Sequence, residues 1–392
     1  MVAGVSWIAN HSLIELLNLP NQFNTITVDE KRYVFQRLYQ IVSRGNLLTL
    51  NSADWDNPTK ELVMAAAKED LRAVEMGSAL SEAYRMVFFA EIESFWLIHP
   101  AWALDKVPAE GDTAHLWECF RLKPAHADGH NHAKHIEHRH SLSDSTFIST
   151  ATSMTLDHEV KQESNHDSDA DSDATEVAEE DQQEEQEKKA QEAYTFSSLN
   201  KTILPDEYLR KWQFVLIIDH PANAFPDIYR DIRSLLHLGR INQAAIKPLY
   251  KLRATLKWIR ILYELALDQY TLGLGPRPIL LTVSDLERSA ETGLITWLCQ
   301  RVGLDPNVIQ VHWIWRAQMN ALFTERARTE ATVLQWFLAQ GMGYTQAILT
   351  ARRQQWVNEF GGAVAKEVEK SVWLAMEDYR YLDQRAGMEK SV

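Results

Sequence analysis

The chain has 392 residues, 45% of them hydrophobic, and a formal net charge of −14, enough for one large domain or two ordinary ones. It lacks the run of about eighteen apolar residues that a membrane span needs, and no basic segment precedes an apolar one at the N-terminus, so neither a span nor a secretory signal is expected. Cys119 and Cys299 are the only cysteines, which excludes a disulfide framework and a cysteine zinc site and favours a reducing, cytoplasmic location.

Short apolar runs alternate along the chain with segments whose apolar residues recur every three or four positions. The runs predict strands at 46–50 (the weakest of them), 85–92, 213–219 and 278–286. The helical spacing occurs at 28–43, 58–83, 226–237, 245–271, 287–301 and 363–383. Continuous rather than alternating apolar strands between helices predict an α/β fold, a parallel β-sheet flanked by helices.

One long segment has a composition unlike the rest. Residues 126–140 hold six histidines, and residues 157–192 carry fifteen acidic side chains against three lysines. We expect residues 124–194 to be a disordered insertion, because they have too few large apolar side chains to form a core. The flanking stretches, 1–123 and 195–392, are then two parts of one domain. The histidines are also the ligands that zinc or nickel prefers, but a low-complexity tract favours no metal site.

The acidic segment also accounts for most of the net charge. It contributes −12 of the −14, so the remainder of the chain is nearly neutral. A nucleic-acid partner is therefore excluded, because binding its phosphates requires a basic face.

Acidic residues and one histidine follow the predicted strands. In a parallel sheet the binding site lies beyond the carboxyl ends of the strands. This places the first candidate residues at Glu91, Asp219, His220 and Asp285.

Three segments in the second half resemble a known family. Residues 200–232 contain a strand followed by DHPANAFPDIYRDI, residues 279–306 end in VGLDP, and residues 356–382 end in DYRYL. These motifs, with residues 85–100 before them, resemble fungal P-loop sulfotransferase-like proteins. The resemblance implies the fold of sulfotransferases that take sulfate from the donor PAPS.

The chain departs from this family where a phosphate would be held. The family has a glycine- and serine-containing loop before a helix, and its amides bind the phosphates of PAPS. The matching helix here is 35–39, which puts Thr27–Tyr33 in place of the loop, with Asp29 and Glu30 in it. A carboxylate repels a phosphate by about 1 kcal/mol even in water. The phosphate loop is therefore predicted to be degenerate.

The family's other phosphate contacts are altered as well. The resemblance places Asp219 where the family has arginine, Asp227 where it has serine, and Ala90 where it has lysine, with Glu91 next to it. We therefore expect neither PAPS nor another cofactor, and no metal.

These departures favour an enzyme that has changed its chemistry. We expect a cofactor-free cyclisation, isomerisation or pericyclic (Diels–Alder type) step on a hydrophobic small molecule of fungal secondary metabolism. A buried carboxylic acid can donate a proton, and a shaped pocket can hold a substrate in a reactive conformation. The predicted catalytic residues are Asp219, His220 and Asp227. The predicted substrate contacts are Glu91, Tyr229, Arg230 and Asp285.

Several alternatives stay open. The protein could be a genuine PAPS-dependent sulfotransferase with His220 as general base, a non-catalytic scaffold, or a terpene cyclase, although it has no DDxxD motif. The candidate residues also have purely structural explanations. Asp219 and Asp227 suit helix N-caps, Asp285 would cap a helix starting at Leu286, and Tyr229 and Arg230 are expected fold residues.

Overall fold

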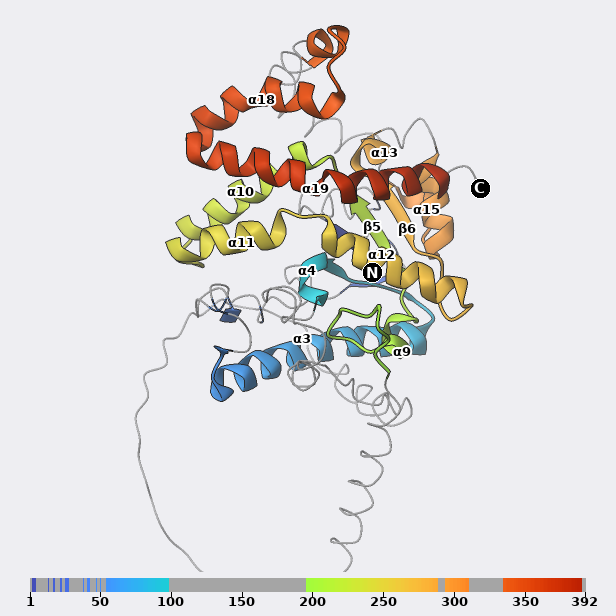
Figure 1. Cartoon of the computed structure of the whole chain (residues 1–392). Helices are drawn as coiled ribbons and strands as arrows, with labels where there is room; N and C mark the ends of the chain where they lie inside the picture. Colours follow the sequence, from blue (N-terminus) through green and yellow to red (C-terminus); the bar gives the residue numbers. More distant parts are fainter. Residues whose placement is uncertain are drawn as a thin grey trace, which may run out of the picture. The chain divides into compact units, whose positions relative to one another are not determined.

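The computed structural model describes about half of the chain (Figure 1). The described residues are 2–4, 13, 17, 22, 25–27, 38, 41, 42, 47, 50, 54–98, 195–287, 293–309 and 334–389. All of them belong to one compact unit formed by residues 1–124 and 195–392, and residues 125–194 form a separate unit. The predicted insertion 124–194 lies outside the described residues.

The core of the unit is a parallel sheet of four strands in the order β4-β1-β5-β6. The strands are β1 (Val2–Gly4), β4 (Glu91–Glu93), β5 (Val215–Ile218) and β6 (Ile279–Thr282). Ala3 pairs with Ile92 on one side and with Leu216 on the other. Two further strands, β2 (Thr25–Thr27) and β3 (Val87–Phe89), pair in parallel as a separate sheet. The α/β class with a parallel sheet is confirmed.

β5 and β6 are strands because consecutive apolar side chains, four in β5 and three in β6 before the buried Thr282, are buried on alternating faces. Val215, Ile217 and Leu281 pack on one face with the apolar side of helix α15 (Leu294–Val302). Leu216 and Leu280 pack on the opposite face with the larger core. A strand that is buried on both faces does not alternate apolar and polar residues, so a continuous apolar run is the pattern that predicts it.

Seven main helices accompany the sheet (Figure 1). Their bounds are α3 (Asn57–Tyr84), α10 (Pro221–His237), α11 (Ile246–Arg253), α12 (Lys257–Thr271), α15, α18 (Tyr344–Phe360) and α19 (Gly362–Glu389). The short elements are α4 (Ser94–Leu97), α9 (Asp206–Leu209), α13 (Val283–Glu287) and two 3-10 turns at Gln243–Ala245 and Pro306–Val308. Helix α19 contacts both β5 and β6 and packs against α10 and α18. None of the helices described here has the length and hydropathy to cross a membrane.

The observed elements differ from the predicted ones in five places. Leu47 lies in a 3-10 turn and Leu50 in a bend, so the strand predicted at 46–50 is wrong at both described positions. The run 85–92 is divided into β3 and β4, and 278–286 is a strand followed at once by α13. The helix predicted at 226–237 begins five residues earlier, and 245–271 is two helices separated at 254–256.

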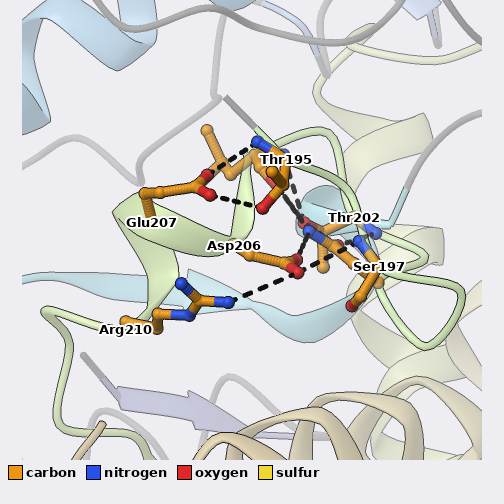
Figure 2. A network of polar contacts seen from close by, with 8 residues as sticks. Thr195, Ser197, Thr202, Asp206, Glu207 and Arg210 are labelled. Atoms are coloured by element: carbon orange, nitrogen blue, oxygen red, sulfur yellow. Dashed lines mark hydrogen bonds and ion pairs between the residues drawn. The ribbon is translucent and has the colours of Figure 1, made fainter. Parts of the chain in front are cut away.

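A polar loop forms at residue 195, where the described part of the chain resumes (Figure 2). The buried carboxylate of Asp206 accepts hydrogen bonds from the Ser197 amide (3.0 Å) and the Asn200 side chain (2.6 Å). Thr202 donates to Asn200 Oδ1 at 2.8 Å. The loop also joins the chain before the gap, because Ile203 N–H donates to Leu97 O at 2.9 Å. Residues 97–98 and 202–203 are thus neighbours.

Candidate functional site

The strand order of the sheet defines a topological switch point. From β1 the next strand of this sheet, β4, lies on one side, whereas from β5 the chain continues to β6 on the opposite side. Ligands of open parallel sheets bind where neighbouring strands send their connections in opposite directions. Here that position lies between the carboxyl ends of β1 and β5. Asp219 and His220 come directly after β5.

His220 begins helix α10 and is its N-cap. Its Nδ1 accepts the Ala222 backbone N–H at 3.2 Å, and Pro221 occupies the first helical position, where proline suits the helix. Its Nε2 lies 3.3 Å from Thr345 Oγ1, and the Thr345 hydroxyl in turn donates to Met376 Sδ at 3.8 Å. Because Nδ1 is an acceptor and the Thr345 proton is used elsewhere, these bonds assign the proton to Nε2.

Two aromatic rings enclose this imidazole. Tyr344 of α18 and Tyr379 of α19 meet it edge to face, with ring centroids at 5.2 Å and 5.0 Å. Only 5% of His220 is exposed. Burial, and then the positive charge of Arg352, lowers the pKa of His220 to about 4. The side chain at the switch point is therefore a neutral imidazole that donates through Nε2.

Asp219 is held by the same helix start. Its Oδ1 accepts the His220 backbone N–H at 2.6 Å and the Asn223 side-chain amide at 3.0 Å. The N-cap is His220, so the capping roles predicted for Asp219 and for Asp227, which lies inside α10, are wrong. The Asp219 carboxylate instead orients the residues on either side of the helix start. The carboxylate stays partly exposed at the end of β5.

Arg352 of α18 completes this arrangement for a reason set by the sequence. Pro226 lies inside α10 and has no N–H, so the carbonyl of Ala222, four residues earlier, lacks its helical partner. Arg352 Nη1 donates to that carbonyl at 3.1 Å and to Asn223 Oδ1 at 2.7 Å. The arginine therefore repairs the helix and places a positive charge near His220.

Asp285 has a well-defined structural role at the end of β6. Its carboxylate accepts the Thr282 N–H at 3.0 Å, and its own N–H donates to Thr282 Oγ1 at 3.1 Å. This reciprocal pair is a capping box, which starts the helix at Val283 rather than at Leu286.

The two strand-end acids share a neighbour, Tyr379. Burial foremost, and then the charges of Asp383 and Asp219 and, more weakly, Asp285, raise the pKa of the Tyr379 hydroxyl. Tyr379 thus lies within electrostatic reach of acids from β5, β6 and its own helix. The described site is rich in carboxylates and holds a neutral imidazole.

The other predicted residues of α10 face α18 and α11. Arg230 pairs with Asp227 and, in a bidentate arrangement, with Glu359 of α18. Burial raises the pKa of Asp227, and the charge of Arg230 opposes that rise. The Tyr229 ring packs edge to face on Tyr250 at 5.7 Å. All three side chains make contacts between helices. The catalytic role of Asp227 and the substrate contacts of Tyr229 and Arg230 therefore remain predictions.

Glu91 and the phosphate loop are only partly described. Glu91 is the first residue of β4 and pairs with Val2 of β1, so it lies at the amino end of the four-stranded sheet and not at the carboxyl edge where it was predicted. The loop predicted at Thr27–Tyr33 follows β2, which pairs with β3 outside the four-stranded sheet. The strand at the switch point is β1, so a loop there would follow Gly4 rather than Thr27. The predicted register of the loop therefore disagrees with the topology, and residues 28–33 lie outside the described residues.

The sequence missed the contributions of α18 and α19. Tyr344, Thr345 and Arg352 come from a helix more than 120 positions after His220, so no local pattern links them. Tyr379 lies in the DYRYL motif that carried part of the resemblance, which was a usable signal. No group of three or more potential metal ligands occurs among the residues that the structure describes.

The geometry defines an α/β protein with a carboxylate- and imidazole-lined switch point. Residues of this chain are 31% identical over 203 residues to Sulfotransferase ppzF of Metarhizium majus and 30% identical over 203 residues to Sulfotransferase ppzF of Metarhizium rileyi. Each match covers 49% of this chain and 57% of the relative, so the chain spans little more than half the length of these proteins. No protein-family model and no solved structure matches. The predicted resemblance to fungal sulfotransferase-like proteins is confirmed over about half of the chain.

Proposed function

We propose that this protein is an enzyme that converts an uncharged, hydrophobic small molecule at the switch point, without PAPS or another cofactor. The reaction class is a cyclisation, an isomerisation or a pericyclic step of Diels–Alder type in fungal secondary metabolism. His220 donates a hydrogen bond from Nε2 to a substrate oxygen that replaces Thr345 Oγ1 as its acceptor, and Asp219 accepts or returns a proton beside it. Glu91, the first residue of the neighbouring strand β4, is proposed as a further substrate contact.

The observation that carries this proposal is the hydrogen bonding of the buried His220, whose Nδ1 accepts the Ala222 N–H and leaves the proton on Nε2. A neutral imidazole at a helix N-terminus is a hydrogen-bond donor whose proton does not leave at neutral pH. Such a donor stabilises charge that develops on a substrate oxygen. The Nδ1 atom already takes the Ala222 N–H, one of the amides that would otherwise hold a phosphate at this helix. Asp219, Asp285 and Asp383 add negative charge around Tyr379, which packs on His220, and this charge disfavours an anionic donor.

Metabolite profiling of a gene-deletion strain would supply the substrate for a test. Turnover by the purified protein is then compared for wild type, His220→Asn, Asp219→Asn and a control, His237→Gln, which alters the exposed histidine at the other end of α10. The two site variants should lose about 100-fold or more in kcat, as expected for removal of a preorganised donor or a proton acceptor. Full activity in both would remove these residues from the chemistry.

A second candidate is a PAPS-dependent sulfotransferase, favoured by the printed name of both Metarhizium relatives. It would require His220 to accept a proton, although its Nδ1 is occupied and its Nε2 is protonated. Adenosine 3′,5′-bisphosphate, the product nucleotide, separates the two candidates. A site with a Kd of 1 µM would stabilise the fold by about 4 kcal/mol at 1 mM nucleotide. A clear rise in Tm would establish the second candidate and dismiss the first.

A further inference from the structure

Two tyrosines from the C-terminal helices cover the imidazole at the switch point. Tyr344 is the first residue of α18, and Tyr379 lies in the second half of α19. Their rings stand at 82° and 73° to the His220 ring, which is the edge-to-face arrangement. Neither residue was among the predicted site residues.

The burial of His220 is unusual for its position. It directly follows a strand at the edge where a ligand is expected, yet only 5% of it is exposed. Tyr344, by contrast, is 49% exposed, so its ring has one side on the imidazole and another in solvent. The tyrosine rings and Thr345 therefore separate the imidazole from water.

We propose that Tyr344 and Tyr379 are positioning residues that hold His220 as a neutral imidazole with its proton on Nε2. The proposal deepens the proposed function. It rests on that function in one respect only, which is that His220 binds the substrate. The two rings act through His220: they fill the space that water would need to solvate an imidazolium, and they fix the plane of the ring.

The charged groups around His220 come from every element that packs on it. On its own segment Asp219 is adjacent, and it favours a protonated imidazole. From α18 the guanidinium of Arg352 disfavours protonation. From α19 Tyr379 presents a neutral ring, and the charges of Asp383 of the same helix and Asp285 of α13 act on its hydroxyl. Since Asp219 and Arg352 oppose one another, the desolvation that the rings impose decides the outcome.

Long-range NMR of full-length protein labelled with ¹⁵N-histidine reports the tautomer and titration of His220 directly, with the His220→Asn spectrum identifying its signals. In wild type we expect a neutral imidazole with Nε2–H between pH 8 and pH 5. Tyr379→Leu and Tyr344→Ala should each move the pKa of His220 upward, toward its usual value of 6.5. Tyr379→Phe keeps the ring and should keep the wild-type titration.

The matched controls are Tyr381→Leu and Tyr270→Ala. Tyr381 lies on α19 but contacts Arg260 and Arg385, and Tyr270 ends α12 with 44% exposure, close to that of Tyr344. Both controls should leave the His220 signals in place. An ordinary titration of His220 in wild type, a proton on Nδ1, or unchanged titration in both folded site variants would overturn the proposal. Because the readout needs no substrate, a failed turnover assay would count against the proposed function alone.

Discussion

Arg230 and Glu359 face each other across two helices, 129 positions apart in the chain. Arg230 Nε lies 2.7 Å from Glu359 Oε1, and Nη2 lies 2.8 Å from Oε2, so the pair is bidentate. The guanidinium also lies 5.4 Å from the centre of the Phe360 ring, in cation–π distance. This contact ties the end of α18 to α10. The other end of α18 carries Tyr344, so the pair helps to set the distance between Tyr344 and His220.

Breaking this pair should cost a modest part of the stability. The side chains of Arg230 and Glu359 are 38% and 30% exposed, so solvent screens their attraction. We expect Arg230→Met to lower the free energy of unfolding by about 1 to 2 kcal/mol, since it also leaves Asp227 without its partner. Arg353→Met is the control, because Arg353 pairs with Glu369 between α18 and α19 but is 60% exposed. Urea unfolding should show a smaller loss for the control, and equal losses would contradict the argument.

The free energy of unfolding should decrease as the pH falls, in a pH range set by the pKa of His220. Its pKa is about 4 in the folded protein and 6.5 when exposed, so below pH 6.5 the unfolded chain binds a proton that the folded one rejects. Stability from this group is therefore complete above pH 6.5 and decreases as the pH falls toward 4. Between pH 7.5 and pH 4.5 the loss should be about 2 to 3 kcal/mol. His220→Asn, which keeps an N-cap residue, should show that much less pH dependence in urea titrations. An identical dependence in both proteins would mean that His220 is protonated normally.

The sequence predicted the sheet well because its signal was local. Four buried apolar residues in β5 and three in β6 leave few alternatives to a buried strand, and the polar residues after them had to lie at the carboxyl edge. The start of α10 was missed for an equally local reason. Pro221 and Pro226 both suit the first turn of a helix, and nothing nearby shows that Arg352 satisfies the carbonyl that Pro226 leaves open.

The position predicted for the phosphate loop disagrees with the topology of the sheet. Residues 35–39 matched a motif, but the motif does not state which strand precedes it, and β2 pairs outside the main sheet. Which strand is central depends on pairing between Val2–Gly4 and partners that are about 90 and 210 positions away. The enclosure of His220 is non-local in the same way. Sequence patterns fix periodicity and strand ends, whereas tertiary contacts decide which helix covers the site.

Arg352 allows a test of the link between helix repair and protonation. Arg352→Met should leave the Ala222 carbonyl without a partner and lower the free energy of unfolding by about 1 to 2 kcal/mol. It should also raise the pKa of His220, because a neighbouring positive charge is removed. Adding Pro226→Ala restores an N–H for that carbonyl and should recover part of the stability while leaving the pKa raised. No recovery of stability in the double variant, measured by urea unfolding, or an unchanged pKa of His220 in Arg352→Met, measured by histidine NMR, would disprove this account of Arg352.

The polar loop in Figure 2 should depend on one buried acid. Asp206 is 2% exposed and accepts from the Ser197 N–H and the Asn200 side chain, so Asp206→Ala removes two hydrogen bonds made by a buried carboxylate. We expect a loss of about 2 to 4 kcal/mol in the free energy of unfolding. Its neighbour Glu207 bonds to Thr195 in a more exposed position, and Glu207→Ala should cost under about 1 kcal/mol. Similar losses in the two variants would show that burial does not determine how much each carboxylate contributes to the free energy of unfolding.

Residues 124–194 are predicted to be an insertion within the domain. Ile98 and Thr202 form an antiparallel bridge, and Ile203 N–H bonds to Leu97 O, so the chain is already closed at the base of this segment. Replacing residues 125–194 by a short Gly-Ser linker should therefore preserve cooperative unfolding, with a change in free energy within about 1 to 2 kcal/mol, because each halving of a loop changes its closure entropy by about 0.6 kcal/mol. Extending the deletion through Asp206 removes the polar loop and should abolish cooperative unfolding. Loss of the native circular dichroism and melting transition in the shorter deletion would show that residues 125–194 are part of the domain, and would remove the proposed boundaries.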